Sequence, residues 1–323
     1  GPLLARYGEA NIALPGGCRL GPRPVDLHLM GFKKLGATVT TEHGVVHARA
    51  SKLTGARIIF PKVSVGATKN CLMAAVMAEG ETILENCAKE PEIVDLADFL
   101  VAMGANITGQ GTSQLKVQGV ENMHGVEYKV LPDRIEAGTF LVAAVMTGGE
   151  VTVNDCRPED LGALISVLKE AGQDVEVGSD YVTVKAVHPI QPVEVATAPH
   201  PGFPTDMHPQ IVAMLALADG ASLLNETIFS GRFMYAMELV RLGASLRVSD
   251  RQVFIRGVKE FSGAPVDAPD LRAGAALVLA GMAAEGEPLI SGIHFIDRGY
   301  QNLEERLRSL GADIQRLEKP VHA

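Results

Sequence analysis

The sequence predicts a mixed α/β protein built from repeated units and divided into two domains. A Leu-Gly-Ala-like signature recurs five times, and its glycines are separated by 68, 68, 71 and 68 residues. A Gly-Glu or Asp-Gly turn after an Ala-rich stretch lies 23 to 25 residues before each of the last four of these glycines. With 323 residues, 47% of them hydrophobic, the chain can also form two ordinary cores. The signature glycines are Gly36, Gly104, Gly172, Gly243 and Gly311.

Each unit is expected to contain the same elements in the same order. An Ala-, Leu- and Met-rich helix, such as 67–78, ends at a glycine that supplies a left-handed C-cap. A β-prone strand follows, as at 82–84, 151–153 and 222–224, and then a polar loop and an amphipathic helix. Alternating strands such as 252–255 close the unit. Because the Ala-rich helices are apolar on nearly all sides, we expect them to lie inside, between sheets.

The first unit differs from the others. Its Gly8-Glu9 turn lies 28 residues before Gly36, so its loop holds about four extra residues, Pro15 to Cys18. Its Ala-rich helix should begin about 12 to 15 residues before Gly8, which is before residue 1. We therefore expect the chain to lack the start of this unit, and to be unstable and poorly active by itself.

Composition excludes several classes of protein. The longest apolar stretch, Ala273 to Ala284, is shorter than the roughly 20 residues that cross a bilayer, and no secretory signal is recognisable. We therefore expect a cytoplasmic location and no membrane association. A net charge of -9 argues against nucleic-acid binding. The four cysteines and the histidines lack metal-binding spacing, so no disulfide framework and no metal are expected. A monomer is the expected oligomeric state.

Arginines recur in the polar loops after the strands, which are natural positions for a site. The guanidinium group matches carboxylate and phosphate geometry, so this recurrence suggests an anion clamp in an acidic protein. Ordinary surface ion pairs are the alternative for any single arginine. The four residues are Arg23, Arg157, Arg232 and Arg298.

Cys18 lies in a glycine-rich loop next to Arg19 and Arg23. Neighbouring cations favour the thiolate, so Cys18 is predicted to be a reactive acid or nucleophile. The other three cysteines, Cys71, Cys87 and Cys156, are expected to be buried and inert.

Three further segments precede helices and carry polar groups. Asp206 follows a Pro-rich connection and either caps the next helix or acts as a base; its spacing does not decide between the two. The segments Lys62 to Thr68 and Asp270 to Arg272 precede Ala-rich helices. Helix N-termini with Lys and Ser nearby suit phosphate binding.

Nine motifs follow one another along the chain: Pro15 to Cys18, Arg23 to Leu27, Lys62 to Thr68, Glu90 to Asp95, Leu131 to Glu136, Phe203 to Met207, Arg232 to Met234, Asp270 to Arg272 and His294 to Tyr300. In this order they resemble the UDP-N-acetylglucosamine 1-carboxyvinyltransferase family of enolpyruvyl transferases. The resemblance implies an inside-out α/β barrel of six repeated units in two domains, expected here at 1–131 and 132–323. It also places a Lys-Asn pair that helps bind and protonate phosphoenolpyruvate before residue 1.

The resemblance implies transfer of the enolpyruvyl group of phosphoenolpyruvate to the 3-hydroxyl of UDP-N-acetylglucosamine. Phosphate is released and no cofactor is needed. This is the first committed step of peptidoglycan synthesis, and therefore of cell wall biogenesis, cell shape and cell division. Phosphoenolpyruvate and UDP-N-acetylglucosamine are the expected partners.

The same resemblance assigns roles to individual residues. Cys18, on a loop that acts as a lid, would be the proton donor or product-release residue and the target of fosfomycin. Asp206 would be the base, while Arg298 and Arg23 would hold phosphoenolpyruvate. Arg232 and Arg134 would support the site. The implied substrate-binding residues are Arg23, Pro24, Val25, Asp26, Leu27, Lys62, Val63, Ser64, Val65, Gly66, Ile228, Arg232, Asp270 and Arg272, the last of which would join phosphoenolpyruvate on closure.

Two alternatives remain. A 3-phosphoshikimate 1-carboxyvinyltransferase shares the repeat, but the Pro-Gly-Gly-Cys and Arg-Pro-Val-Asp-Leu segments are not expected in it. A non-catalytic nucleotide-sugar-binding remnant is the other, and the retained Cys18, Asp206 and arginines speak against it.

Overall fold

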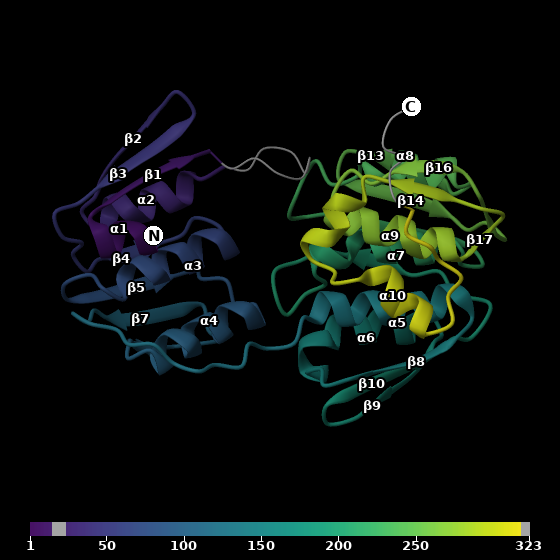
Figure 1. The fold of residues 1–323 in the computed structure, drawn as a ribbon, viewed down its shortest axis with the longest axis horizontal. Helices are drawn as coiled ribbons and strands as arrows, with labels where there is room; N and C mark the ends of the chain where they lie inside the picture. The colour runs from purple at the N-terminus through teal and green to yellow at the C-terminus, as the bar shows by residue number, and fades with distance from the viewer. Residues whose placement is uncertain (15–23, 318–323) are drawn as a thin grey trace. The chain divides into compact units, whose positions relative to one another are not determined.

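The computed structural model describes residues 1–14 and 24–317 of the chain (Figure 1). The described residues form two compact units. The first contains residues 1–14, 24–131 and 199–201, and the second contains 132–198 and 202–317. Each unit has its own hydrophobic core. The expectation that the units are separate domains stays a prediction, because compactness does not measure independent stability.

The first unit combines two sheets with four helices. Strands β1, β3 and β2 form an antiparallel sheet, whereas the second sheet has the order β4-β5-β7-β6. Helix α3 contacts α1, α2 and α4 and contributes five residues to the hydrophobic core. The elements are α1 (Pro2–Tyr7), β1 (Glu9–Ala13), α2 (Asp26–Lys34), β2 (Thr38–Glu42), β3 (Val45–Arg49), β4 (Arg57–Ile59), α3 (Val65–Ala75), β5 (Glu81–Glu85), α4 (Pro91–Ala102), β6 (Asn106–Thr108) and β7 (Gln114–Gln118).

The second unit contains the remaining elements. Its sheets have the orders β8-β10-β9 and β11-β12-β14-β13, with two further pairs, β15-β17 and β16-β18. Its helical segments are α5 (Arg134–Thr147), η1 (Pro158–Leu161), α6 (Gly162–Glu170), η2 (Thr205–Met207), α7 (His208–Leu215), α8 (Tyr235–Arg241), α9 (Leu271–Met282), η3 (Ile293–Arg298) and α10 (Leu303–Ser309). Its strands are β8 (Glu150–Asn154), β9 (Asp174–Val177), β10 (Tyr181–Lys185), β11 (Glu194–Ala196), β12 (Ala221–Asn225), β13 (Ser245–Ser249), β14 (Gln252–Arg256), β15 (Phe261–Ser262), β16 (Pro265–Asp267), β17 (Ala284–Glu285) and β18 (Leu289–Ser291).

The repeat seen in the sequence is present in the fold. The two four-stranded sheets have the same plan, a parallel pair followed by an antiparallel hairpin. All five signature glycines follow an amphipathic helix and have φ between 81° and 102°. An L side chain is strained in this left-handed region, which explains why glycine recurs at these turns.

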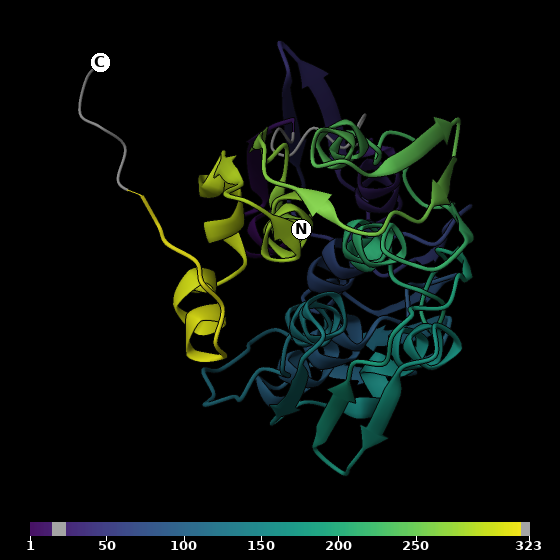
Figure 2. The same cartoon turned by 90° about the vertical axis from the view of Figure 1, so that its right-hand side faces the viewer.

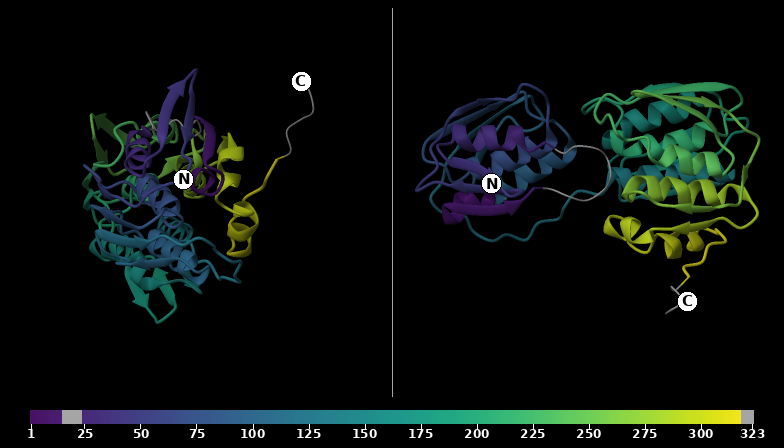
Figure 3. Two further views of the ribbon diagram at one scale, coloured as in Figure 1. Left: turned by 90° about the vertical axis from the view of Figure 1, so that its left-hand side faces the viewer. Right: turned by 90° about the horizontal axis from the view of Figure 1, so that it is seen from above.

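The apolar helices lie inside the units, as predicted. All eight residues of α7 are buried, as are eleven residues of α5 and eight of α9. These three helices contact one another in the second unit and lie side by side in it (Figures 1 and 3). The hairpins β9-β10 and β13-β14 lie on the outer surface of the second unit (Figure 2). No helix among the described residues is long and apolar enough to cross a membrane.

The predicted glycine cap is wrong for three of the Ala-rich helices. The helix expected at 67–78 was to end at Gly80, but α3 ends at Ala75. Helices α7 and α9 likewise end at Leu215 and Met282, before Gly220 and Gly286. The backbone after α3 leaves the helical path because the N–H of Ala78 bonds Ala75 and that of Glu79 bonds the carbonyl of Leu53. Helix α5, in contrast, does end at a left-handed glycine, Gly148.

Candidate active site

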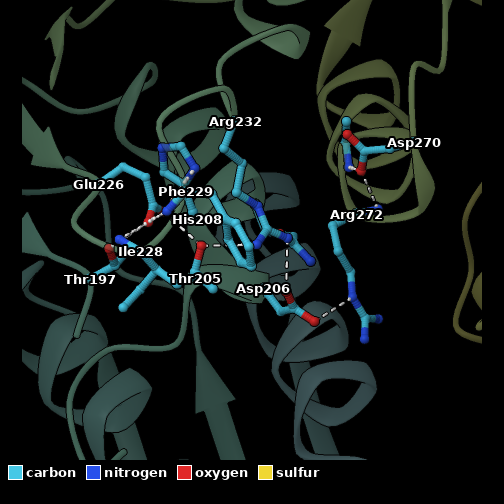
Figure 4. A network of polar contacts seen from close by, with 12 residues as sticks. Thr197, Thr205, Asp206, His208, Glu226, Ile228, Phe229, Arg232, Asp270 and Arg272 are labelled. Carbon is cyan, nitrogen blue, oxygen red and sulfur yellow. Dashed lines mark hydrogen bonds and ion pairs between the residues drawn. The ribbon is translucent and has the colours of Figure 1, made fainter. Parts of the chain in front are cut away.

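Asp206 lies in a short 3-10 turn, η2, and is not the cap of the following helix. Helix α7 begins at His208, and no side chain in the described part of the chain caps it. The Asp206 carboxylate accepts instead from two arginines, with Oδ1 2.8 Å from Nη2 of Arg232 and Oδ2 3.4 Å from Nε of Arg272 (Figure 4). Its side chain is 42% exposed, so a ligand can reach it. The capping alternative is therefore wrong, and the geometry favours a site carboxylate.

Two opposing effects determine the charge of Asp206. Its burial favours the protonated form, but the positive charges and hydrogen bonds of Arg232 and Arg272 outweigh burial and hold the pKa of Asp206 below its usual 3.8. The carboxylate is therefore ionised at neutral pH. While both arginines hold it, it is a weak proton acceptor, because a base is most effective with a pKa near the working pH.

The two arginines are positioned by different elements. Arg232 precedes α8, its side chain is 2% exposed, and its Nη1 donates to Oγ1 of Thr205 at 2.8 Å. Arg272 lies in the first turn of α9, with its guanidinium carbon 5.4 Å from the ring centroid of Tyr300. Both cations therefore converge on one carboxylate from separate parts of the second unit.

Asp270 and Ile228 lie next to this cluster. The carboxylate of Asp270 caps α9 by accepting from the backbone N–H groups of Arg272 at 2.9 Å and Ala273 at 3.0 Å. Ile228 is 37% exposed, and its backbone N–H donates to Glu226 at 2.7 Å. Asp270 therefore fixes the helix start that carries Arg272, while the Ile228 side chain is available to a ligand.

Arg298 and Arg134 are further candidates in the second unit. Arg298 is the last residue of η3, and Arg134 is the first residue of α5. Arg298 lines a pocket of about 480 Å³. The other lining residues are Glu136, Asp297, Gly299, Tyr300, Gln301, Asn302, Arg306 and Arg316.

The candidates of the first unit lie at two helix starts. Pro24 and Val25 precede α2, Asp26 and Leu27 begin it, and Leu27 is buried in the core. Lys62 and Val63 precede α3, where Ser64 is the cap and accepts from the N–H of Ala67 at 3.2 Å. Val65 and Gly66 form its first turn.

These two helix starts are close together within the first unit. Helices α2 and α3 contact each other, and Nδ1 of His28 is 3.0 Å from Nδ2 of Asn70. The segments 24–27 and 62–66 therefore lie at the starts of two neighbouring helices. Cys18 and Arg23 lie outside the described residues.

The remaining arginine of the recurrent set is engaged elsewhere. Arg157 forms ion pairs with Glu159 at 3.1 Å and Asp160 at 3.3 Å, and its side chain is 46% exposed. This arrangement matches the surface-ion-pair alternative and not an anion clamp.

The three structural cysteines are buried, as predicted. Burial raises the pKa of Cys71 to about 12 and that of Cys87 to about 11, and it also raises the pKa of Cys156. These thiols are therefore poor nucleophiles. Within residues 1–14 and 24–317, no group of three or more His, Cys, Asp or Glu is arranged to hold a metal ion.

Sequence reasoning missed the polar residues behind Asp206. Glu226 follows β12, is completely buried, and accepts hydrogen bonds from Thr197 at 3.0 Å and Thr205 at 2.7 Å (Figure 4). His208 is also buried, and burial holds its pKa well below the usual value. Polar residues also end other strands, for example Glu85 on β5, so nothing in the local sequence marks Glu226 as buried.

A comparison with known families defines the class of the protein. A family model described as EPSP synthase (3-phosphoshikimate 1-carboxyvinyltransferase) matches residues 1–307. The chain therefore belongs to this family of enolpyruvyl transferases.

Curated relatives give a more particular likeness. The chain is 51% identical to the UDP-N-acetylglucosamine 1-carboxyvinyltransferase of Koribacter versatilis, over 98% of the chain and 73% of the relative. It is 53% identical to the protein of the same name from Solidesulfovibrio magneticus, over 98% of the chain and 76% of the relative. These names agree with the family resemblance of the sequence motifs.

Solved structures show the same fold. The enolpyruvyl transferase NikO from Streptomyces tendae is similar, with a TM-score of 0.84, 28% identity, and coverage of 97% of this chain and 75% of that chain. EPSP synthase from Acinetobacter baumannii gives a TM-score of 0.73 at 19% identity, over 96% of this chain and 76% of that chain. The predicted enolpyruvyl transferase fold is therefore confirmed.

Proposed function

We propose that the protein transfers the enolpyruvyl group of phosphoenolpyruvate to the 3-hydroxyl of UDP-N-acetylglucosamine and releases phosphate. The observation that carries the proposal is the Asp206 carboxylate, ionised and partly exposed between Arg232 and Arg272. A carboxylate suits removal of a proton from a sugar hydroxyl, and arginines suit the phosphate and carboxylate of phosphoenolpyruvate. Relatives at 51% and 53% identity carry the name of this activity.

The reaction follows an addition and an elimination. In the addition, the sugar 3-oxygen bonds C2 of phosphoenolpyruvate, Asp206 takes the hydroxyl proton, and C3 gains a proton. In the elimination, the bond between C2 and the phosphate oxygen breaks, and C3 loses a proton to restore the double bond. We assign the proton donor to Cys18 by family resemblance, and the anion-binding groups to Arg23, Arg298 and Arg272.

Arg272 links substrate binding to the strength of the base. In the described structure it donates to Oδ2 of Asp206. If Arg272 turns to an anionic substrate, Asp206 loses one of its two cations and its pKa rises, because burial is then less offset. A more basic Asp206 would accept the hydroxyl proton more readily. Binding of phosphoenolpyruvate would thus activate the base.

We place this activity at the first committed step of peptidoglycan synthesis, and through it in cell shape and division. Fosfomycin would act by alkylating Cys18. The cytoplasm is the proposed location, because both substrates carry several charges and do not cross an apolar bilayer unaided.

Phosphate release by the purified protein tests the function. The protein is incubated with phosphoenolpyruvate and either UDP-N-acetylglucosamine or shikimate 3-phosphate, with and without fosfomycin. Release, even if slow, should require the nucleotide sugar and be lost with fosfomycin. Release with shikimate 3-phosphate alone would support the other branch of the family. Binding of the nucleotide sugar without turnover would support a non-catalytic remnant.

The Asp206→Asn variant tests the assigned base in the same assay. Asparagine keeps the shape but does not take up a proton at neutral pH, so we expect kcat to fall by about 10²- to 10⁴-fold. The control is Asp174→Asn, which changes an exposed carboxylate on β9 of the same unit. Equal activity of the two variants would contradict the role of Asp206.

A further inference from the structure

The polar network behind Asp206 has a buried carboxylate at its far end. Glu226 is completely buried, yet four hydrogen bonds reach its two oxygens. Oε1 accepts from Thr197 Oγ1 at 3.0 Å and from the backbone N–H groups of Ile228 at 2.7 Å and Phe229 at 3.0 Å. Oε2 accepts from Thr205 Oγ1 at 2.7 Å. These donors stabilise a buried negative charge, which would otherwise be costly.

His208 does not neutralise this charge. Its Nδ1 is 3.7 Å from Oε2 of Glu226, and its Nε2 is 3.1 Å from the hydroxyl of Tyr235. Burial and the nearby positive charge of Arg232 hold the pKa of His208 well below its usual value. The imidazole is therefore neutral, and the hydrogen-bond donors hold the carboxylate of Glu226.

Thr205 connects Glu226 to Arg232. A threonine hydroxyl has one proton, and here that proton points to Glu226. Its lone pairs are consequently left for Nη1 of Arg232, which lies at 2.8 Å. Glu226 therefore sets the direction of the hydroxyl, and the hydroxyl sets one end of the guanidinium group.

Because Thr205 fixes one end of the guanidinium group of Arg232, it also affects the position of Asp206 at the other end. The group is planar and rigid, so fixing Nη1 also fixes Nη2, which donates to Oδ1 of Asp206 at 2.8 Å. Arg232 is almost completely buried, and among the described residues no hydrogen-bond partner reaches its Nε. Its orientation therefore depends strongly on Thr205 and Asp206.

Glu226 also holds the chain segment that carries Arg232. By accepting from the N–H groups of Ile228 and Phe229, it closes the turn after β12. The guanidinium carbon of Arg232 lies 5.6 Å from the ring centroid of that same Phe229. Glu226 therefore holds the backbone of this loop directly and the side chain of Arg232 through Thr205.

We propose that Glu226 is a positioning residue for Asp206, acting through the hydroxyl of Thr205 and the guanidinium group of Arg232. This relay rests on the proposed function, in which Asp206 takes the sugar hydroxyl proton. Neither Glu226 nor Thr205 needs to touch substrate in this role. Misplacement of a reacting group by about 1 Å costs on the order of 10²-fold in rate, so a relay of three hydrogen bonds can affect turnover.

Replacing Thr205 tests the relay without changing a charge. Thr205→Val has nearly the same shape but no hydroxyl, so we expect kcat to fall by about 10- to 100-fold, with the KM for UDP-N-acetylglucosamine within about threefold. Thr205→Ser keeps the hydroxyl and should recover kcat to within about threefold of wild type. The control is Thr152→Val, which removes an exposed hydroxyl that bonds Thr183 on the neighbouring strand.

The relay is overturned if Thr205→Val is as active as Thr152→Val, or if Thr205→Ser is as poor as Thr205→Val. In the second case, packing of the methyl group would matter instead of the hydroxyl. If Thr205→Val does not fold, as judged by circular dichroism, Glu226→Gln takes its place. Its amide cannot accept from Thr205 while its oxygen serves the backbone donors, so kcat should fall similarly. Wild-type activity in that variant would overturn the relay.

A second readout separates failure of the relay from failure of the proposed function. The carboxyl NMR signal of Asp206 can be titrated whether or not the protein turns over substrate. Without the Thr205 hydroxyl, Arg232 should hold Asp206 less firmly, so the pKa of Asp206 should rise in Thr205→Val and return in Thr205→Ser. An inactive wild type with this shift would contradict the function alone. An unchanged titration together with unchanged kcat would contradict the relay.

Discussion

Asp206 and Asp270 show how two similar carboxylates acquire different roles. Both precede buried helices, and the sequence offered helix capping for Asp206. Asp270 does cap, because the N–H groups of Arg272 and Ala273 reach its Oδ1. Helix α7 instead begins with His208 and Pro209, and proline has no N–H to offer a cap. The intervening 3-10 turn leaves the Asp206 carboxylate for Arg232 and Arg272.

The Arg272→Gln variant tests the charge balance at Asp206. The substitution removes one of the two cations that lower the pKa of Asp206, so the pKa of Asp206 should rise. The acid limb of the kcat/KM profile, which in wild type reflects the lowered pKa of Asp206, should move to higher pH. The stability from this ion pair is present above the unfolded pKa and is lost as pH falls through the lowered folded pKa.

The control for this prediction is Arg241→Gln, which breaks an exposed pair with Glu238 on α8. It should leave the profile in place. An acid limb that stays at the same pH in Arg272→Gln would show that Arg272 does not influence the ionisation of Asp206.

At the level of elements, helix starts combine stability with site geometry. Helix α3 begins at Val65 and is capped by Ser64, whose Oγ accepts from the N–H of Ala67. The family resemblance assigns the same residue to substrate binding. These roles can be separated, because several side chains can cap a helix whereas few would fit one ligand.

Ser64→Ala should lower the free energy of unfolding by about 1 kcal/mol, because the α3 cap is lost. Ser64→Asp should keep most of the stability, since aspartate is an equally good cap. Urea unfolding measures both variants. If Ser64→Asp is as unstable as Ser64→Ala, capping does not explain the contribution of Ser64.

The glycine in the turn after each amphipathic helix leads to a second prediction about the elements. Gly36 has φ +93°, and a Cβ added there would meet no atom of residues 1–14 and 24–317 within 4 Å. Gly36→Ala should therefore destabilise by about 1–2 kcal/mol through backbone strain alone. Gly162 begins α6 with φ -51° and also has open space, so Gly162→Ala should be neutral or stabilising. Similar losses in the two variants, by thermal unfolding, would count against backbone strain.

At the scale of the whole molecule, each of the two units has its own hydrophobic core. Leu72 lies in the core of the first unit and Leu141 in that of the second, and both are completely buried. If the units are separate domains, each core should govern the stability of its own unit.

Leu72→Ala and Leu141→Ala should each cost about 2–5 kcal/mol, because each leaves a cavity. We expect hydrogen exchange to accelerate in α3 for the first variant and in α5 for the second, with little change in the other unit. Equal acceleration throughout the chain would show a single cooperative unit and contradict the predicted division at 131/132.

The repeat, the element types and the burial of the Ala-rich helices followed from the sequence, because they depend on local preferences. Glycine spacing marks the left-handed turns, and apolar composition marks the inner helices. Family resemblance also singled out Asp206, Arg232 and Arg272. Their contacts could not be read from the sequence, since they join positions up to 66 residues apart.

Tertiary structure alone decided which polar residues are buried and what they bond. It made Asp206 a partner of two arginines, Asp270 a cap, and Arg157 a surface ion pair. It also buried Glu226 behind Thr205, although polar residues such as Glu85 on β5 end other strands without being buried. Burial and hydrogen-bond direction depend on which segments pack together, and the local sequence pattern does not specify that packing.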